Sequence, residues 1–201
     1  MSPPRVLLFD LGGVLIEFVG LDEMRKLLLD AINAPEIRRR WIASKAIVDF
    51  ETGRCSRAEF AAQFVAEWQL AIDPQEFLRQ FAIWTRPPLP ATLELLGRLR
   101  QRYRLACLSN TNEIHWATIL ETYDLRAVLD RHFSSHELGL HKPNREIFTR
   151  VAGELGCAPH EIVFFDDNQE NVSGAIAAGL QAHRVAGPED LPDVIGRLAL
   201  L

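Results

Sequence analysis

The sequence predicts an α/β protein, a parallel β-sheet covered by helices on both faces. Three observations support this. Short apolar segments rich in β-favouring residues recur along the chain. Helical patterns separate them, and strands that alternate with helices are typical of a parallel sheet. One long segment, from about residue 17 to residue 86, breaks the alternation because it contains helical patterns and no convincing strand.

The first predicted strand, Val6–Phe9, leads directly into this helical segment. Four helix starts follow, each marked by a capping residue, a capping box or an early proline: Asp22, Pro35, Ser56 with Glu59, and Asp73 with Pro74. The proline-rich stretch Pro87–Pro90 then forms a stiff connector. We therefore expect a four-helix insertion after the first strand. The predicted domains are a core of residues 1–16 and 88–201 and a helical domain of residues 17–87.

Strands and helices alternate in the rest of the chain. Apolar residues recur at helical spacing in the predicted helices, and glycine follows two of them as a stop. The predicted helices are Ala91–Arg102, Arg145–Leu155, Asn171–Ala178 and Leu191–Leu201. The predicted strands are Leu105–Leu108, Ile162–Phe165 and Ala182–Val185. Together with the first strand, they give a doubly covered, Rossmann-like sheet.

Composition excludes several classes of protein. The chain has 201 residues, is 48% hydrophobic and carries a formal net charge of −5, so it suits a globular protein and is a poor nucleic-acid binder. The basic cluster Arg38-Arg39-Arg40 is interpreted as a solvated helix face. The three cysteines are dispersed and form no CxxC, which favours a reducing cytoplasm over a disulfide framework or zinc site. We see neither a signal peptide nor a membrane span.

Polar residues follow three of the predicted strands at the point where each ends. They are Asp10, Ser109 with Asn110, and Asp166 with Asp167. In an open parallel sheet these ends lie along one edge, where ligands bind. Any one cluster could be an ordinary turn or helix cap, but three at one edge indicate a functional crevice.

Three carboxylates in one crevice need a cation. Two carboxylates ~4 Å apart repel by about 4 kcal/mol at an effective dielectric constant near 20. Oxygen ligands suit Mg²⁺, which binds one or two carboxylates together with a substrate phosphate. Lys142 is a further positive charge from a fourth segment, although alone it could be a surface lysine before a helix that starts at Pro143.

These four segments resemble the motifs of the haloacid dehalogenase-like superfamily, in order and over nearly the whole chain. They are Phe9-Asp10-Leu11-Gly12-Gly13-Val14, Leu108-Ser109-Asn110-Thr111, Gly139-Leu140-His141-Lys142-Pro143, and Phe164-Phe165-Asp166-Asp167-Asn168 with Asn171. The helical insertion matches the small cap that this family carries after its first motif. Within the family, the chain is most similar to the small sugar-phosphate phosphatases and to the phosphatase domain of soluble epoxide hydrolases.

The resemblance implies a role for each motif residue. Asp10 would attack phosphorus and form an aspartyl-phosphate, which water then hydrolyses. Ser109 and the amides of Asn110 and Thr111 would hold phosphoryl oxygens, and Lys142 would offset negative charge. The implied Mg²⁺ ligands are Asp10, the carbonyl of Gly12, and Asp167, with Asp166 orienting Lys142 or a metal-bound water, and Asn171 in support.

Gly12 departs from the pattern, since many phosphatases of the family carry a second, acid–base Asp there. Three interpretations follow. The enzyme could be slower, or act on substrates with good leaving groups such as sugar 1-phosphates. Another residue, such as His141, Glu17 or a cap residue, could transfer the proton. The chain could instead be a 2-haloacid dehalogenase, which uses the same Asp without metal. The pair Asp166-Asp167 favours a phosphatase over a dehalogenase, and a non-enzymatic phosphate-binding or regulatory protein ranks lower.

The remaining expectations concern substrate and partners. We expect a small phosphorylated substrate, no nucleic-acid or membrane partner, and a monomer or weak homodimer. The cap would set specificity, with Trp41 and Phe50 as candidates for stacking on a sugar, and Glu51 and Arg54 nearby. These aromatic residues could equally pack inside the cap. The sequence does not name the phosphomonoester.

Overall fold

The computed structural model describes residues 3–29 and 31–201. The first two positions of the predicted core domain and position 30 of the predicted helical domain lie outside them. Five parallel strands form one sheet in the order β3-β2-β1-β4-β5. The strands are β1 (Val6–Phe9), β2 (Arg104–Ser109), β3 (Arg131–Ser134), β4 (Ile162–Asp166) and β5 (Gln181–Arg184). The expected parallel α/β fold is therefore confirmed.

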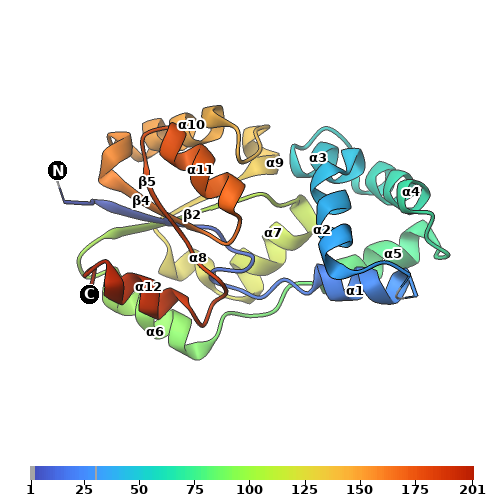
Figure 1. The fold of residues 1–201 in the computed structure, drawn as a ribbon, viewed down its shortest axis with the longest axis horizontal. Coiled ribbons are helices and arrows are strands. Elements are labelled where there is room, and N and C mark those ends of the chain that lie inside the picture. Colours follow the sequence, from blue (N-terminus) through green and yellow to red (C-terminus); the bar gives the residue numbers. More distant parts are fainter. Residues whose placement is uncertain (1–2, 30) are drawn as a thin grey trace.

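Helices cover both faces of the sheet, as Figure 1 shows. Along β1, Leu7 and Phe9 point to one face and Val6 and Leu8 to the other, and all four are fully buried. Helices of the first face are α6 (Pro90–Leu99), α7 (Glu113–Ala117), α8 (Leu125–Val128) and α12 (Leu191–Arg197). Those of the second face are α10 (Arg145–Leu155) and α11 (Gln169–Ala177), with the short α9 (Ser135–Leu138) beside them. A π-helical turn spans Thr118–Thr122 and a 3-10 turn spans Pro159–Glu161.

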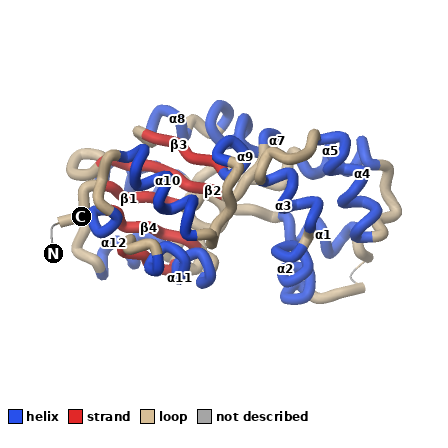
Figure 2. Tube along the Cα trace, turned by 90° about the horizontal axis from the view of Figure 1, so that it is seen from above, coloured by secondary structure: helices blue, strands red, loops and turns tan. Residues whose placement is uncertain are grey.

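Among the described residues, five helices, rather than the four expected, lie between β1 and α6. They are α1 (Gly20–Leu27), α2 (Ala34–Ala43), α3 (Lys45–Glu51), α4 (Arg57–Trp68) and α5 (Pro74–Phe81), and we call them the helical insertion. Prediction missed α3 because Ser44 ends α2 and also caps α3, so no turn residues separate the two. The insertion lies beyond one end of the sheet (Figure 2).

The predicted helix starts were mostly correct. Ser56 and Glu59 form the expected capping box of α4, and Asp73 caps α5 ahead of Pro74. The start expected at Asp22 was wrong, because α1 begins at Gly20 and Asp22 lies inside its first turn. There the negative charge still complements the helix dipole.

The helical insertion has an apolar core of its own. Thirteen buried residues, including Phe60, Phe64 and Phe77, cluster separately from the two clusters on the faces of the sheet. Its entry and exit segments pair side by side, since the amide of Arg86 donates to the carbonyl of Glu17 (3.0 Å) and that of Val19 to the carbonyl of Trp84 (2.9 Å). The division into a core and a cap domain at residues 17–87 stays a prediction. Among the described residues, no helix combines the length and apolarity needed to cross a bilayer.

Candidate active site

The carboxyl ends of three central strands bring the predicted polar clusters together. Asp10 follows β1, Ser109 ends β2 and Asp166 ends β4. Strand β1 pairs with β2 on one side and β4 on the other, so Phe9 lies opposite Cys107 and Phe165. The three clusters therefore meet at one edge, as the sequence predicted.

Asp10, Asp166 and Asp167 form an acidic group at this edge. Each offers a carboxylate oxygen, and the three oxygens lie within 4.8 Å of one another. Asp166 is fully buried, and its oxygens accept bonds from Lys142 Nζ (2.6 Å), the Asn168 amide (2.8 Å) and Asn171 Nδ2 (3.0 and 3.1 Å). Its lone pairs are therefore largely occupied. Asp10 and Asp167 are the better placed carboxylates for a metal ion, and Asp166 holds Lys142 in place.

Lys142 is a buried cation rather than a surface lysine. Its Nζ donates to the carbonyl of Leu108 (3.0 Å), contacts Asp10 Oδ1 (3.1 Å) and donates to Asp166 Oδ2 (2.6 Å), so its three N–H groups have three acceptors. Burial lowers the pKa of Lys142, but the carboxylates of Asp10 and Asp166 raise it by more. The pKa therefore stays above its usual value. The ammonium group is thus charged at neutral pH.

The pKa of Asp10 shows the crowding of negative charge. Burial raises the pKa, Lys142 lowers it, and Asp166 and Asp167 raise it again, to about 7 in the metal-free protein. Asp10 Oδ1 also accepts a bond from the amide of Leu11 (2.7 Å). A bound cation would favour the ionised carboxylate, so the charge of Asp10 and the binding of a cation at this site would depend on each other.

A glycine brings the loop after β1 close to Asp167. Gly13 has a φ of +75°, and a Cβ there would lie 3.0 Å from Asp167 Cγ. Gly12, whose carbonyl was predicted to bind Mg²⁺, lines the same cavity as Asp10 and Asp167. The loop therefore places Gly12 and Asp167 at one site.

The loop after β2 only partly matches the predicted phosphate-binding role. Ser109 Oγ lies 3.5 Å from the Asn110 carbonyl, which leaves the hydroxyl weakly engaged. The Asn110 side chain accepts from the Lys142 amide (2.9 Å) and donates to the Lys142 carbonyl (3.0 Å). The amide of Thr111, expected to bind a phosphoryl oxygen, instead donates to Ser135 Oγ (2.9 Å). Thr111 could bind phosphate through this amide only if Ser135 turned away.

A cavity of about 330 Å³ opens over these residues, between the sheet edge and the helical insertion. The core contributes Asp10, Ser109 and Lys142 to its lining. The insertion contributes polar Arg38 and Glu51 and a wall of apolar side chains: Phe18, Leu21, Trp41, Ile42, Ile47 and Val48. The cavity is therefore lined on both sides, by polar residues of the core that include Asp10 and by largely apolar residues of the helical insertion.

Two of the suggested specificity residues do not reach this cavity. Phe50 is buried in the insertion and stacks on Phe60, with ring centroids 4.3 Å apart. Arg54 contacts Asp49 (3.9 Å) and does not line the cavity. Trp41 both lines the cavity and packs on Phe64 and Phe81 in the insertion, so the alternative of packing inside the insertion holds for both aromatic residues.

Arg38 is a cavity residue that sequence analysis missed. Its Nη2 lies 3.2 Å from Asp167 Oδ2. The interpretation of the arginine cluster as a solvated face holds for its neighbours, because Arg39 pairs with Glu36 (2.7 Å) and Arg40 lies over the ring of Trp68. Arg38 differs because it points across to the core, and no local pattern distinguishes it from the other two.

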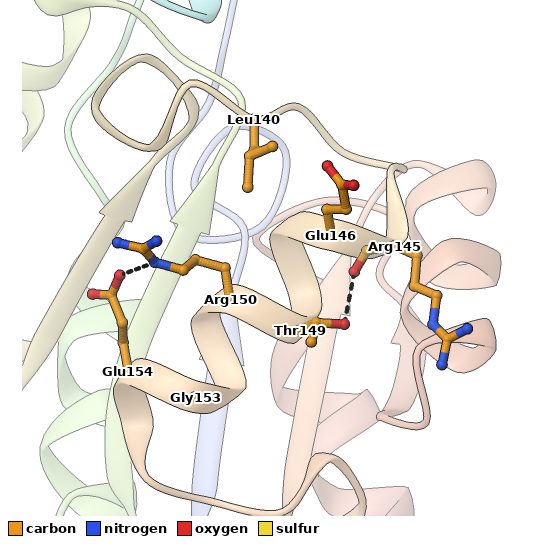
Figure 3. A pocket seen from close by; sticks show the side chains of 7 residues that line it. All are labelled: Leu140, Arg145, Glu146, Thr149, Arg150, Gly153 and Glu154. Atoms are coloured by element: carbon orange, nitrogen blue, oxygen red, sulfur yellow. Dashed lines mark hydrogen bonds and ion pairs between the residues drawn. The ribbon is translucent and has the colours of Figure 1, made fainter.

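A second depression lies on the outside of α10 (Figure 3). Two of its charged side chains pair with each other, since Arg150 donates to Glu154 (2.6 Å), and Thr149 donates to the backbone carbonyl of Arg145 (3.2 Å). It is open to solvent and shares no residue with the cavity over Asp10. We therefore place the active site at the cavity.

A family model for haloacid dehalogenase-like hydrolases matches residues 4–179. This chain belongs to that family. The parallel sheet and the position of Asp10 after β1 agree with the expectation drawn from the four motifs.

Haloacid dehalogenase-like hydrolases of more than one activity are similar to this chain. A pyrimidine 5'-nucleotidase from Escherichia coli is 25% identical over 201 residues, covering 91% of this chain and 88% of the relative. An (S)-2-haloacid dehalogenase from a Pseudomonas species is also 25% identical, covering 92% and 86%. A family enzyme from Bacteroides thetaiotaomicron, solved with magnesium and inorganic phosphate, has a TM-score of 0.77 at 25% identity, covering 95% and 98%. Family membership alone therefore does not choose between phosphate and halide release.

Proposed function

We propose that this hydrolase is a Mg²⁺-dependent phosphatase that hydrolyses a small phosphomonoester through an aspartyl-phosphate. The acidic group of Asp10, Asp166 and Asp167 carries the proposal. Three carboxylates beside the ammonium group of Lys142 and the guanidinium group of Arg38 still leave excess negative charge, which disfavours binding of a phosphate dianion until a further cation is present.

The donor set fits Mg²⁺. Asp10 and Asp167 supply carboxylate oxygens, Gly12 supplies a backbone carbonyl, and the cavity has room for water ligands. When bound, the ion would neutralise charge on the transferring phosphoryl group. These ligands are assigned from donor chemistry and placement.

The roles of the residues follow from their contacts. Asp10 Oδ1 is held by the Leu11 amide and Lys142, so Oδ2 is the oxygen left to attack phosphorus. The ester oxygen leaves with the electron pair of the P–O bond and takes a proton from water. Ser109 Oγ is available to donate to a phosphoryl oxygen, and Lys142 keeps Asp10 oriented.

A specific observation keeps 2-haloacid dehalogenation as the second candidate. Gly12 cannot act as an acid or base, and an (S)-2-haloacid dehalogenase is among the proteins that are similar to this chain. Asp10 would then displace halide from carbon, with no need for Mg²⁺. Against it, a dehalogenase has no use for Asp167 beside Asp10, whose repulsion a metal ion would relieve.

The deciding experiment measures two products from the same enzyme. Inorganic phosphate is assayed with a panel of sugar phosphates and nucleoside monophosphates, with Mg²⁺ or with chelator, and halide is assayed with 2-haloacids. Asp10→Asn is compared with wild type, and Asp193→Asn, which alters an exposed carboxylate of α12, serves as the control. Phosphate release that requires Mg²⁺ and Asp10 supports the proposal. Metal-independent halide release would select the second candidate, and neither product would point to a binding protein.

A further inference from the structure

The proposed hydrolysis of an aspartyl-phosphate needs a group that takes a proton from water, and Gly12 cannot supply it. Such a group must line the cavity that holds Asp10 and have an unoccupied proton-accepting atom. Asp10 and Asp167 already have proposed roles as nucleophile and metal ligand. Among the other described residues that line the cavity, the candidates are two histidines and the carboxylates of Glu17, Glu51 and Glu170.

His115 is excluded by its hydrogen bonds. Its Nε2 lies 2.7 Å from the carbonyl of Phe81, which only accepts, so Nε2 carries the proton. Its Nδ1 lies 3.4 Å from Asn112 Nδ2, and Asn112 Oδ1 already accepts from two backbone amides. Both ring nitrogens are therefore occupied, and burial lowers the pKa of His115.

His141 is fixed in the same way. Asn110 Oδ1 accepts from the Lys142 amide (2.9 Å), so the other atom of that side chain, Nδ2, is the one that faces His141 Nδ1 at 3.1 Å. Since Nδ2 donates, Nδ1 must accept, and the ring proton lies on Nε2. That nitrogen lies 2.9 Å from Glu51 Oε2. His141 is therefore a neutral donor to Glu51, with no ring nitrogen left for water.

Glu51 is the shielded carboxylate that remains. Its side chain is 12% exposed, whereas Glu17 and Glu170 are exposed residues. Its Oε2 accepts from His141, and its Oε1 accepts no hydrogen bond from the residues that the structure describes. It ends α3, and the turn after it lies against the core because Gly53 has no side chain: a Cβ there would be 2.6 Å from the carbonyl of His136.

We propose that Glu51 is the general base for the second half of the reaction, and that His141 and Asn110 position it. Glu51 Oε1 takes a proton from the attacking water as its oxygen bonds to phosphorus. The bond between phosphorus and the Asp10 oxygen breaks, and its electron pair returns to the Asp10 carboxylate. Inorganic phosphate leaves, and Glu51 passes the proton to solvent. The inference rests on the proposed phosphatase function and assigns the acid–base group that its site lacks.

Burst kinetics with p-nitrophenyl phosphate and Mg²⁺ test the proposal, because nitrophenolate leaves without needing a proton. Glu51→Gln keeps the acceptor for His141 and removes the base. We expect a stoichiometric burst of nitrophenolate, then turnover slowed by about 10²- to 10⁴-fold, with the phosphoryl group retained on Asp10 and detected by intact-protein mass spectrometry. Glu113→Gln is the matched control, because Glu113 pairs with Arg57 (2.9 Å) between insertion and core but does not line the cavity.

Each outcome decides the proposal. Three results together support it: Glu51→Gln shows a burst followed by slow turnover, Glu51→Asp recovers part of the turnover, and Glu113→Gln turns over at a near-normal rate. Turnover of Glu51→Gln within about threefold of wild type overturns it, because losing a general base costs far more. Loss of the burst itself would also overturn it, since Glu51 would then act before phosphorylation. If the wild type shows no nitrophenolate release that depends on Mg²⁺ and Asp10, the phosphatase function fails, and the assignment of Glu51 fails with it.

Discussion

We expect Gly53→Ala to lower activity much more than its effect on stability would explain, because Gly53 determines how closely the helical insertion approaches the core. Its φ is +67°, and a Cβ there would lie 2.6 Å from the carbonyl oxygen of His136. Opening that contact to the 3.4 Å of ordinary van der Waals contact requires a movement of 0.8 Å. The turn carries Glu51 on its N-terminal side, so Glu51 should move with it.

The expected magnitudes differ for the two properties. A residue with a side chain in the left-handed region costs about 1–2 kcal/mol of stability. A displacement of about 1 Å in a catalytic group can cost on the order of 100-fold in rate. Gly156→Ala is the matched control, since Gly156, at the end of α10, has a φ of +64° and a Cβ there would meet nothing within 4 Å.

The assay pairs urea unfolding with kcat/KM on the best phosphomonoester. Both variants should lose free energy of unfolding, Gly53→Ala at least as much as Gly156→Ala because of the contact with His136, and only Gly53→Ala should lose most of its activity. Equal activity in the two variants would refute the reasoning, because it would mean that the close approach of this turn to His136 does not position the active site.

Three further predictions concern the carboxylates. Burial raises the pKa of Asp10 to about 7 in the metal-free protein, so protons should compete with Mg²⁺ for this carboxylate. The affinity for Mg²⁺, measured by calorimetry, should therefore fall about tenfold per pH unit below pH 7 and level off above it. An affinity that does not change between pH 5 and 8 would contradict this. Asp166→Ala should lower the free energy of unfolding by about 3–5 kcal/mol in urea titrations, because it leaves the buried ammonium of Lys142 with one carboxylate fewer; a loss under 1 kcal/mol would show that the pair is not needed. Gly13→Ala should weaken Mg²⁺ binding about 10- to 100-fold by displacing Asp167, and unchanged calorimetric affinity would count against the assigned ligand.

Much of the fold could be predicted because the central strands are continuous apolar segments. Strand β3 was missed for the opposite reason: Arg131-His132-Phe133-Ser134 is an edge strand with two polar residues at its start, so it lacks the apolar pattern. The predicted strand Ala182–Val185 is shifted by one residue from β5, the other edge strand. Edge strands are paired on one side only, and burial constrains their sequences less.

The candidate site could be predicted as far as it follows strand ends. Asp10, Ser109 and Asp166 each sit where a buried strand stops, so the sheet itself brings them together. Arg38 could not be predicted, because its partner Asp167 is 129 positions away and only the packing of the insertion joins them. The occupied amide of Thr111 depends in the same way on Ser135, which belongs to a helix that the sequence did not indicate. The expected monomeric or weakly dimeric state, cytoplasmic location and small-molecule partner stay predictions.

The paired entry and exit segments have an evolutionary consequence. Because Glu17 and Arg86 lie side by side, the chain leaves the core and returns to it at one place, and the insertion is one continuous stretch of sequence. Recombination could replace that stretch, and with it the apolar wall of the cavity, without touching Asp10, Lys142 or Asp166. Selection on such a chain can change the molecule that is recognised, together with Glu51, while Asp10, Lys142 and Asp166 of the core stay constant. Relatives as different as a nucleotidase and a dehalogenase are what this architecture allows.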